Sequence, residues 1–298
     1  MLSNIAYLGE ILALATAIVW AFAVILFKKS GETVHPIALN VYKNTLAGLL
    51  LIPTIYIFGE TLFRPAPPED YLLLLLSGIL GIGIADTLFF MCLNLIGAGM
   101  TAIVDCMYSP FIIGLSILWI DESMSVFQIV GVVLIISAIL TATRKKGRGN
   151  ISRRDMLLGL LYGVLGMGTM AVGIVMIKPL LDRSPLLWVT EIRLIGGLAV
   201  LIILLLFNPR RKAIMSTALT TTGWKYTFFG SLMGTYLALM LWLGGMKFTK
   251  ASIAAALNQT SNIWIFIFAA ILLKERINLL KSIGILLAAA GVFLVMYA

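Results

Sequence analysis

The sequence predicts an all-α integral membrane protein, with ten transmembrane helices arranged as two inverted five-helix repeats around a central cavity. Three observations lead to this fold class. The 298-residue chain is 61% hydrophobic and only 12% charged, whereas soluble domains carry about 25% charged residues. Apolar runs of about 20 residues, the length that crosses a bilayer, recur from end to end. The second half of the chain also repeats the pattern of the first.

Ten apolar segments are expected to span the membrane. Connectors with Gly, Pro and charged residues separate them, such as GETVHP, LDRSP and FNPRRK. The first segment lacks a basic stretch before it and an A-x-A cleavage site, so it is interpreted as a span and not as a signal peptide. The expected spans are residues 7–27, 36–58, 71–94, 98–119, 126–143, 155–177, 186–207, 224–246, 249–272 and 279–297.

Two pairs of matching stretches define the repeat. Gly9 and Lys28 of the first span match Gly159 and Lys178 of the sixth, with a shift of 150 residues. Further along, SILWIDESMSVFQIVG matches AAILLKERINLLKSIG with a shift of 153. Because each half holds an odd number of spans, the second half is expected to be inserted upside down, as in many inverted-repeat carriers. The expected division is a first repeat at 1–143, a basic linker at 144–154 and a second repeat at 155–298.

The distribution of Lys and Arg predicts the orientation. Five basic residues lie in connectors on the side that holds both termini, and fifteen lie on the side that holds the linker. Cytoplasmic loops are enriched in Lys and Arg, so both termini are expected outside. This distribution accounts for the net charge of +9 without a nucleic-acid partner. We expect a multi-pass protein of the cell inner (plasma) membrane, either a monomer or a homodimer.

The sequence offers little material for metal or redox chemistry. Cys92 and Cys106 lie singly within spans, and His35, the only histidine, lies at a span boundary. Metal-binding DDxxD or HxxxH pairs, a G-x-S-x-G motif and a P-loop are all absent. We therefore expect no metal, no cofactor and no ATP-driven step. An integral-membrane enzyme is a weaker alternative than a carrier for the same reason.

With these motifs in place, the chain resembles the ten-helix EamA-type permeases of the drug/metabolite transporter superfamily, and the resemblance covers nearly its whole length. It rests on ALATAIVWAFAVILFKK in the first span, on Pro36 followed by Lys43 in the second, and on SPFIIGLSILWIDESMS, which recurs as NIWIFIFAAILLKERIN. Family members often carry arginine where this chain has Lys43. The resemblance implies a transporter of small metabolites but does not select a substrate. We expect a secondary-active carrier that moves a small polar metabolite, an amino acid or a related compound, out of the cell by alternating access.

Polar residues at membrane depth are the candidates for substrate binding or gating. A charge there costs at least about 2.5–3.5 kcal/mol and normally faces a bundle interior or a watery cavity. Asp105 aligns with Asn258 in the repeat, and Lys43 falls near Arg193, so two polar sets are expected to bracket the midplane. With neighbouring aromatic residues, the candidates are Lys43, Tyr42, Asp105, Asp86, Tyr108, Trp20, Arg193, Glu191, Asn258 and Gln259.

These charges also have purely structural interpretations. Lys43 could join helices by pairing with Asp86 or Asp105, and Glu191 and Arg193 could reach the membrane surface. Glu191 and Arg193 are two residues apart, so they do not share a helix face. If Lys43 neutralises one acid, the other is left uncompensated and could exchange a proton. The resulting hypothesis is proton-coupled antiport, with Asp105 or Asp86 as the proton carrier.

The helix-breaking pattern differs between the halves. Pro110 is expected to kink the fourth span just beyond Asp105, whereas Ile263 occupies the aligned position in the second half. A flippase for a lipid-linked or amphipathic substrate stays open as an alternative, because a side-open cavity would give a similar sequence. A channel is disfavoured, since no ring of equivalent filter groups is evident. The expected partners are a small-molecule substrate, the lipid bilayer and, under the antiport hypothesis, protons.

Overall fold

The computed structural model describes residues 7–120, 125–143, 151–249, 254, 257–275 and 278–297, and every regular element within them is helical. Five helices are long and apolar enough to cross a membrane, and three shorter apolar helices accompany them. The five are Leu8–Ser30, Pro68–Ile96, Arg153–Val175, Leu186–Leu206 and Trp224–Phe248. The shorter ones are Ile129–Thr141, Leu257–Leu272 and Leu279–Leu294. An all-helical membrane protein is therefore confirmed, while the count of ten spans and their inverted arrangement stay predictions.

The elements of the first half follow the expected spans within a few residues. They are α1 (Leu8–Ser30), α2 (Pro36–Ile57), α3 (Pro68–Gly78), η2 (Ile79–Ala85), α4 (Asp86–Ile96), α5 (Ala98–Asp105), α6 (Tyr108–Ile120) and α7 (Val126–Thr143). Helix α2 begins at Pro36, where the missing N–H costs no hydrogen bond. The residue before it, His35, accepts a hydrogen bond from the N–H of Ile37 through its Nδ1 atom. Three polar residues inside α2, namely Asn40, Lys43 and Asn44, are buried.

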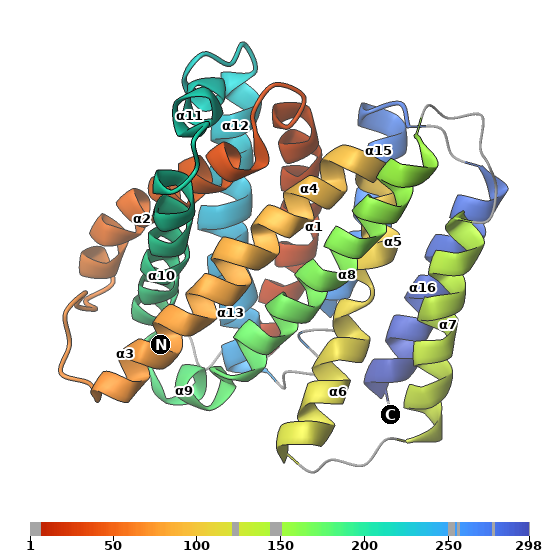
Figure 1. Ribbon diagram of the computed structural model, residues 1–298. Helices are drawn as coiled ribbons and strands as arrows, with labels where there is room; N and C mark the ends of the chain where they lie inside the picture. Colours follow the sequence, from red (N-terminus) through yellow and green to blue (C-terminus); the bar gives the residue numbers. More distant parts are fainter. Residues whose placement is uncertain are drawn as a thin grey trace.

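The second half repeats this order with two additional short helices, α9 after α8 and α11 after α10. Its elements are α8 (Arg153–Val175), α9 (Lys178–Arg183), α10 (Leu186–Leu206), α11 (Arg211–Leu219), α12 (Trp224–Ser231), η3 (Leu232–Leu237), α13 (Ala238–Phe248), α15 (Ser261–Leu272) and α16 (Leu279–Tyr297). Of these two, α11 is a short polar helix in the connector between α10 and α12. It lies at one end of the bundle, next to α12 (Figure 1).

Wide helical turns occur at matching places in the two halves. The segments η2 and η3 are π-helical and begin 153 residues apart. Each continues without interruption from the α-helix before it to the one after it, so that α3, η2 and α4 form one membrane-length helix, as do α12, η3 and α13. Short π-helical stretches of this kind are frequent at functional sites.

The fourth and ninth expected spans are both broken. Helix α5 ends at Asp105 and α6 begins at Tyr108, because Pro110 has no N–H to donate to the carbonyl of Cys106. In the second half the helical residues 257–259 and α15 are separated at Thr260. The break therefore occurs in both halves, although only the first half carries the proline. At the second break, polar side chains make local hydrogen bonds. The side chain of Asn262 donates to the Oε1 atom of Gln259 at 2.6 Å, and the hydroxyl of Thr260 donates to the backbone carbonyl of Leu257.

The helices pack around α1, which contacts α12, α13 and α15 (Figure 1). Helix α10 packs on α2 and α3, α8 packs on α4, and α7 pairs with α16 at the side of the bundle. Close approach depends on glycine at the α3–α10 crossing, where a Cβ atom on Gly78 would lie 1.9 Å from the carbonyl oxygen of Arg193. Small residues at such crossings allow membrane helices to pack tightly.

The repeated lysines have the same role in both halves. Lys28, near the end of α1, donates to the carbonyl of Asn94 in the last turn of α4, and Lys178 donates to the carbonyl of Met246 in the last turn of α13, each at 3.2 Å. A cation at a helix C-terminus satisfies carbonyls that have no partner within the helix and favours the helix dipole. The sequence repeat thus corresponds to a repeated helix-end contact.

Candidate functional site

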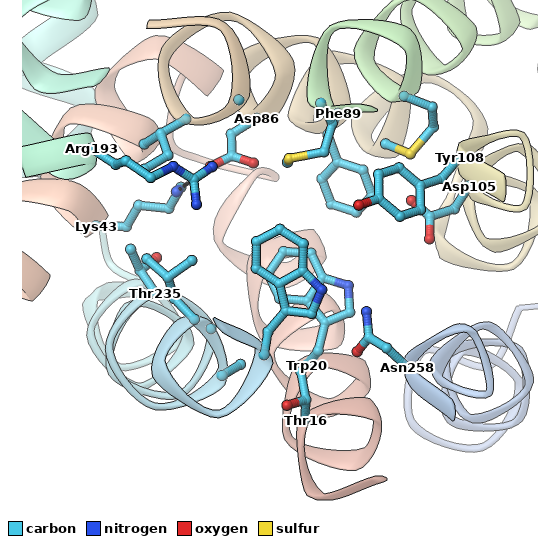
Figure 2. Close-up of a pocket in the computed structure, with 18 of the residues that line it drawn as sticks. Thr16, Trp20, Lys43, Asp86, Phe89, Asp105, Tyr108, Arg193, Thr235 and Asn258 are labelled. Atoms are coloured by element: carbon cyan, nitrogen blue, oxygen red, sulfur yellow. Dashed lines mark hydrogen bonds and ion pairs between the residues drawn. The ribbon is translucent and has the colours of Figure 1, made fainter. Parts of the chain in front are cut away.

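A central cavity of about 130 Å³ lies inside the helix bundle (Figure 2). Both breaks and both wide turns reach it, because Asp105, Asn258, Gly81 and Gly234 all line its wall. Discontinuous helices around a midplane site are a recurrent plan among membrane carriers, since the freed backbone groups border a cavity and not lipid. The remaining lining residues are Thr16, Trp20, Lys43, Asn44, Ile82, Asp86, Phe89, Tyr108, Met167, Met170, Arg193, Thr235, Ala238, Leu239, Trp242 and Gln259.

An ion pair occupies one side of the cavity. The Nζ atom of Lys43 lies 2.6 Å from the Oδ2 atom of Asp86 and donates a further hydrogen bond of 3.1 Å to Asn44. Lys43 is only 3% exposed, so its charge would be very costly without this carboxylate. Lys43 therefore forms its ion pair with Asp86, and Asp105 is left for another partner.

Arg193 lies beside this pair (Figure 2). Its side chain is 1% exposed, and its Nε atom donates to the hydroxyl of Ser77 at 3.0 Å. The guanidinium carbon lies 6.0 Å from the centre of the Trp242 ring, within the range of a cation–π contact. Its NH1 atom is buried and has no hydrogen-bond partner among the described residues. This nitrogen is a hydrogen-bond donor that is free to bind a ligand. Arg193 shares this side of the cavity with a second cation, Lys43.

The opposite side of the cavity is acidic. Asp105 ends α5 and makes no ion pair within the described part of the chain. Asn262 is within hydrogen-bonding reach of its carboxylate. Two further polar atoms on the cavity wall, the hydroxyl of Tyr108 and the Oδ1 atom of Asn258, are buried without a partner. Buried polar groups are normally satisfied, so these atoms indicate a place for a polar ligand.

Aromatic side chains lie between the two polar sides. Trp20 of α1 projects into the middle of the view in Figure 2, with the charged cluster of Arg193, Lys43 and Asp86 on one side and Asp105 on the other. The rings of Trp20 and Phe89 are 5.8 Å apart and tilted by 40°. A flat or apolar part of a ligand could pack here while its polar ends meet the two walls.

Eight of the ten candidate residues line this cavity: Lys43, Asp86, Asp105, Tyr108, Trp20, Arg193, Asn258 and Gln259. Tyr42 and Glu191 do not. Tyr42 is half-buried on a different face of α2, and Glu191 is 4% exposed in the contact between α10 and α2. The roles of all ten in binding stay predictions.

Several lining residues were not among the candidates. Asn44 follows Lys43 directly, Phe89 lies one turn after Asp86, and Thr16 lies one turn before Trp20 on the same face of α1. Helical spacing from the chosen residues would have found Phe89 and Thr16. Thr235 gave no such signal, because its place depends on the wide turn η3.

Membrane-length helices around a buried cavity with charged walls define the class of polytopic helical membrane proteins with an internal polar site. The sequence places the chain more narrowly. The model of the EamA-like transporter family matches residues 7–144 and 157–297, which is nearly the whole chain, and the protein belongs to this family.

Individual relatives and one solved structure agree with this placement. An uncharacterized transporter of Archaeoglobus fulgidus is 25% identical over 293 residues, covering 96% of this chain and 97% of its own. The uncharacterized transporter YvbV of Bacillus subtilis is 26% identical over 288 residues, covering 94% of this chain and 91% of its own. A crystal structure with 16% identity superposes with a TM-score of 0.71 over 96% of this chain and 95% of that one, which shows a shared fold.

Proposed function

We propose that this transporter is a secondary-active carrier for a small zwitterionic metabolite, such as an amino acid or a related compound, and that it works by alternating access in the cell inner membrane. The observation that carries the proposal is the division of the cavity into two walls. One wall holds Lys43 and the free NH1 atom of Arg193, and the other holds the unpaired carboxylate of Asp105. A ligand with an anionic and a cationic end would satisfy both walls at once.

Charge balance supports a ligand that is neutral overall. The lining contains two cations, Lys43 and Arg193, and two acids, Asp86 and Asp105. A free acid would meet Arg193 but leave its other end against the Asp105 carboxylate, and a free amine would do the reverse. Each would therefore lose one of the two charge-assisted contacts that a zwitterion makes.

Competition at Asp105 would supply the coupling. A carboxylate that holds either the ammonium group of the substrate or a proton, but not both, exchanges one for the other. Because a cell maintains an inward proton gradient across its inner membrane, such an exchange would drive the substrate outward. We therefore propose export by proton antiport, with Asp105 as the residue that both ligands share. Asp86 is less suited to this role, since Lys43 already neutralises it.

A thermal-unfolding screen of the purified carrier tests this proposal. The probes are amino acids, the matching carboxylic acids without the amino group, and the matching amines without the carboxylate. A ligand at 100 times its dissociation constant stabilises the folded state by about 2.7 kcal/mol, so we expect clear shifts for zwitterions alone.

The matched variant is Asp105→Asn, because Asn258 shows that the aligned site accepts an asparagine. It should fold normally and lose the preference for the amino group. Equal shifts with the amino-free acids, or the same preference in Asp105→Asn, would contradict the assignment of Asp105. In proteoliposomes, substrate export should also depend on an imposed pH gradient in the wild-type protein and not in Asp105→Asn.

A further inference from the structure

A second unpaired carboxylate lies outside the cavity. Glu191 of α10 is 4% exposed, and a Cβ atom on Gly48 of α2 would lie 3.5 Å from its Oε1 atom. Leu187 and Leu194, one turn to either side on the same face of α10, belong to an apolar cluster that includes Leu51 of α2. The carboxylate thus lies in an apolar contact between two helices of the membrane domain.

No described residue compensates this carboxylate. Its Oε2 atom is buried without a hydrogen-bond partner, and it forms no ion pair within the described ranges. The helices α2, α3, η2 and α13 pack against α10, and their charged or titratable groups are engaged elsewhere or face outward. Six charged or titratable groups on these helices, on η3 and on α10 itself have partners of their own. The pairs are Lys43 with Asp86, Asp70 with Arg183, Tyr71 with the carbonyl of Arg64, Tyr236 with Thr54, Lys247 with the carbonyl of Ser184 and Arg193 with Ser77. Tyr56 and Glu69 are exposed, and Tyr42 is half-buried. Among the described residues, Tyr42 makes no hydrogen bond to Glu191.

Elementary electrostatics decides the state of this group. An ionised carboxylate without a cation or a hydrogen-bond donor loses its hydration and gains nothing in return, which costs several kcal/mol in an apolar interior. The neutral acid avoids that penalty, and its hydroxyl costs far less to bury. Asp86 avoids the penalty differently, through its ion pair with Lys43. Since no cation pairs with Glu191 among the described residues, binding a proton is its remaining way to avoid this penalty.

We propose that Glu191 binds a proton in the conformation described and releases it to water when the contact between α2 and α10 opens. The group is then a proton carrier separate from the substrate cavity, and it ties protonation to the packing of two helices that each contribute a cation, Lys43 and Arg193, to the cavity wall. The step is a simple acid dissociation, in which the proton passes between the carboxyl oxygen and water. This inference rests on the proposed carrier function, because a proton carrier needs a second conformation in which to unload.

Infrared difference spectroscopy of the purified protein measures the protonation directly and needs no substrate. A protonated carboxyl group gives a C=O stretch that ionised carboxylates lack, and we expect this band at neutral pH. Glu191→Gln, which keeps the shape of the neutral acid, should remove a component of the band that the control Asp105→Asn leaves in place. Labelling glutamate with ¹³C in the wild-type protein should shift the same component, which gives a test that does not depend on folding of the variant.

Two outcomes would overturn the inference. One is a carboxyl band that neither Glu191→Gln nor glutamate labelling changes between about pH 5 and pH 9, a range that covers the ionisation of ordinary and buried carboxyl groups. The other is a ratio of protons to substrate during export in proteoliposomes that is the same in Glu191→Gln as in the wild-type protein, because Asp105 alone would then account for the coupling. A band assigned to Glu191 in a protein that moves none of the tested substrates would instead contradict the carrier proposal and leave the proton site standing.

Discussion

The ion pair between Lys43 and Asp86 combines two roles that substitutions can separate. Both residues line the cavity, and the pair also joins α2 to α4 at 2.6 Å. Removing one partner of a buried pair leaves the other charge uncompensated, which typically costs about 3–5 kcal/mol. Replacing both partners by apolar residues of similar size is often neutral or stabilising. Loss of the charge and loss of the fold are therefore distinct events at this site.

We predict that Lys43→Met alone lowers the free energy of unfolding by about 3–5 kcal/mol, and that Lys43→Met/Asp86→Leu restores most of it. Leucine is chosen because Leu239 occupies the matching cavity position in the second half. The double variant should still fail to transport, since the cation-bearing wall has lost one of its charges. Chemical or thermal unfolding in detergent measures the first effect, and counterflow in proteoliposomes the second. Wild-type transport by the double variant would show that the pair is structural only.

For single residues, the sequence indicated the depth of a charged side chain in the membrane better than the side of the helix that it faces. Lys43, Asp86, Asp105 and Arg193 were expected near the midplane because charges there need a polar environment, and all four line the cavity. Glu191 was expected with them and lies outside, because a residue two positions from Arg193 points to another side of the helix. The spans are apolar on nearly every side, so their pattern does not say which side faces the cavity. That information comes from packing, as at Gly78.

The start of α2 is an element whose stability should depend on pH. The Nδ1 atom of His35 accepts a hydrogen bond from the N–H of Ile37 at 3.2 Å, and the backbone N–H of His35 donates to the hydroxyl of Thr217 in α11. Burial lowers the pKa of His35 from its usual value of 6.5. A group whose pKa is lowered in the folded state contributes stability above the unfolded pKa, and that contribution is lost as the pH falls through the folded pKa. Protonation also removes the acceptor that caps the helix.

We therefore predict that the unfolding temperature of the wild-type protein falls as the pH is lowered below about 6.5. In His35→Ser the fall should be smaller, because a serine hydroxyl accepts the same hydrogen bond at every pH. Helix caps of this kind contribute about 1 kcal/mol. Scanning fluorimetry at a series of pH values, with the two proteins in the same detergent, measures the difference. Parallel curves for the two proteins would rule out His35 as the source.

The two broken spans show what local sequence can reveal about an element. Pro110 predicted the first break, because it removes one backbone donor. The second break at Thr260 has no proline, and hydrogen bonds among Gln259, Asn262 and the backbone accompany it. Such polar residues are equally compatible with a regular span that lines a cavity. Only the folded arrangement distinguishes the two cases.

At the scale of the whole molecule, connectors of the first and second halves meet at one end of the bundle. The hydroxyl of Thr33, between α1 and α2, lies 2.7 Å from that of Thr221, between α11 and α12. A carrier that exposes its cavity alternately to each side must change the relation of its parts at such ends. Thr33 is exposed and Thr221 is half-buried, and the short distance between their hydroxyls makes these positions suitable for an engineered cysteine pair.

We predict that Thr33→Cys/Thr221→Cys forms a disulfide under mild oxidation, that transport then stops, and that a reducing agent restores it. The native thiols of Cys92 and Cys106 are buried and should not interfere. Each single variant, oxidised in the same way, is the matched control. Undiminished counterflow in the fully cross-linked protein would mean that this end of the bundle does not open during the cycle.

The overall architecture was largely readable from the sequence. Span boundaries agree within a few residues for α1, α2, α8 and α10, because hydrophobic length and helix-starting prolines are local properties. The cavity was expected in general terms from the repeat, but its division into a cationic and an acidic wall was not. That division depends on which helix faces meet, which is a property of the complete bundle.

The two wide turns give this bundle a reserve of chain length. A π-helical turn holds more residues than an α-helical turn of the same rise, and η2 and η3 store that surplus beside the cavity, at Gly81 and Gly234. In a regular helix, a shift of one residue rotates everything beyond it by about 100°. Where a wide turn already exists, the extra residue can move along the helix, because one turn tightens to α-helical geometry while the next turn widens. Asp86 and Trp242 could then swing about the helix axis while the membrane-facing ends of their helices keep their positions.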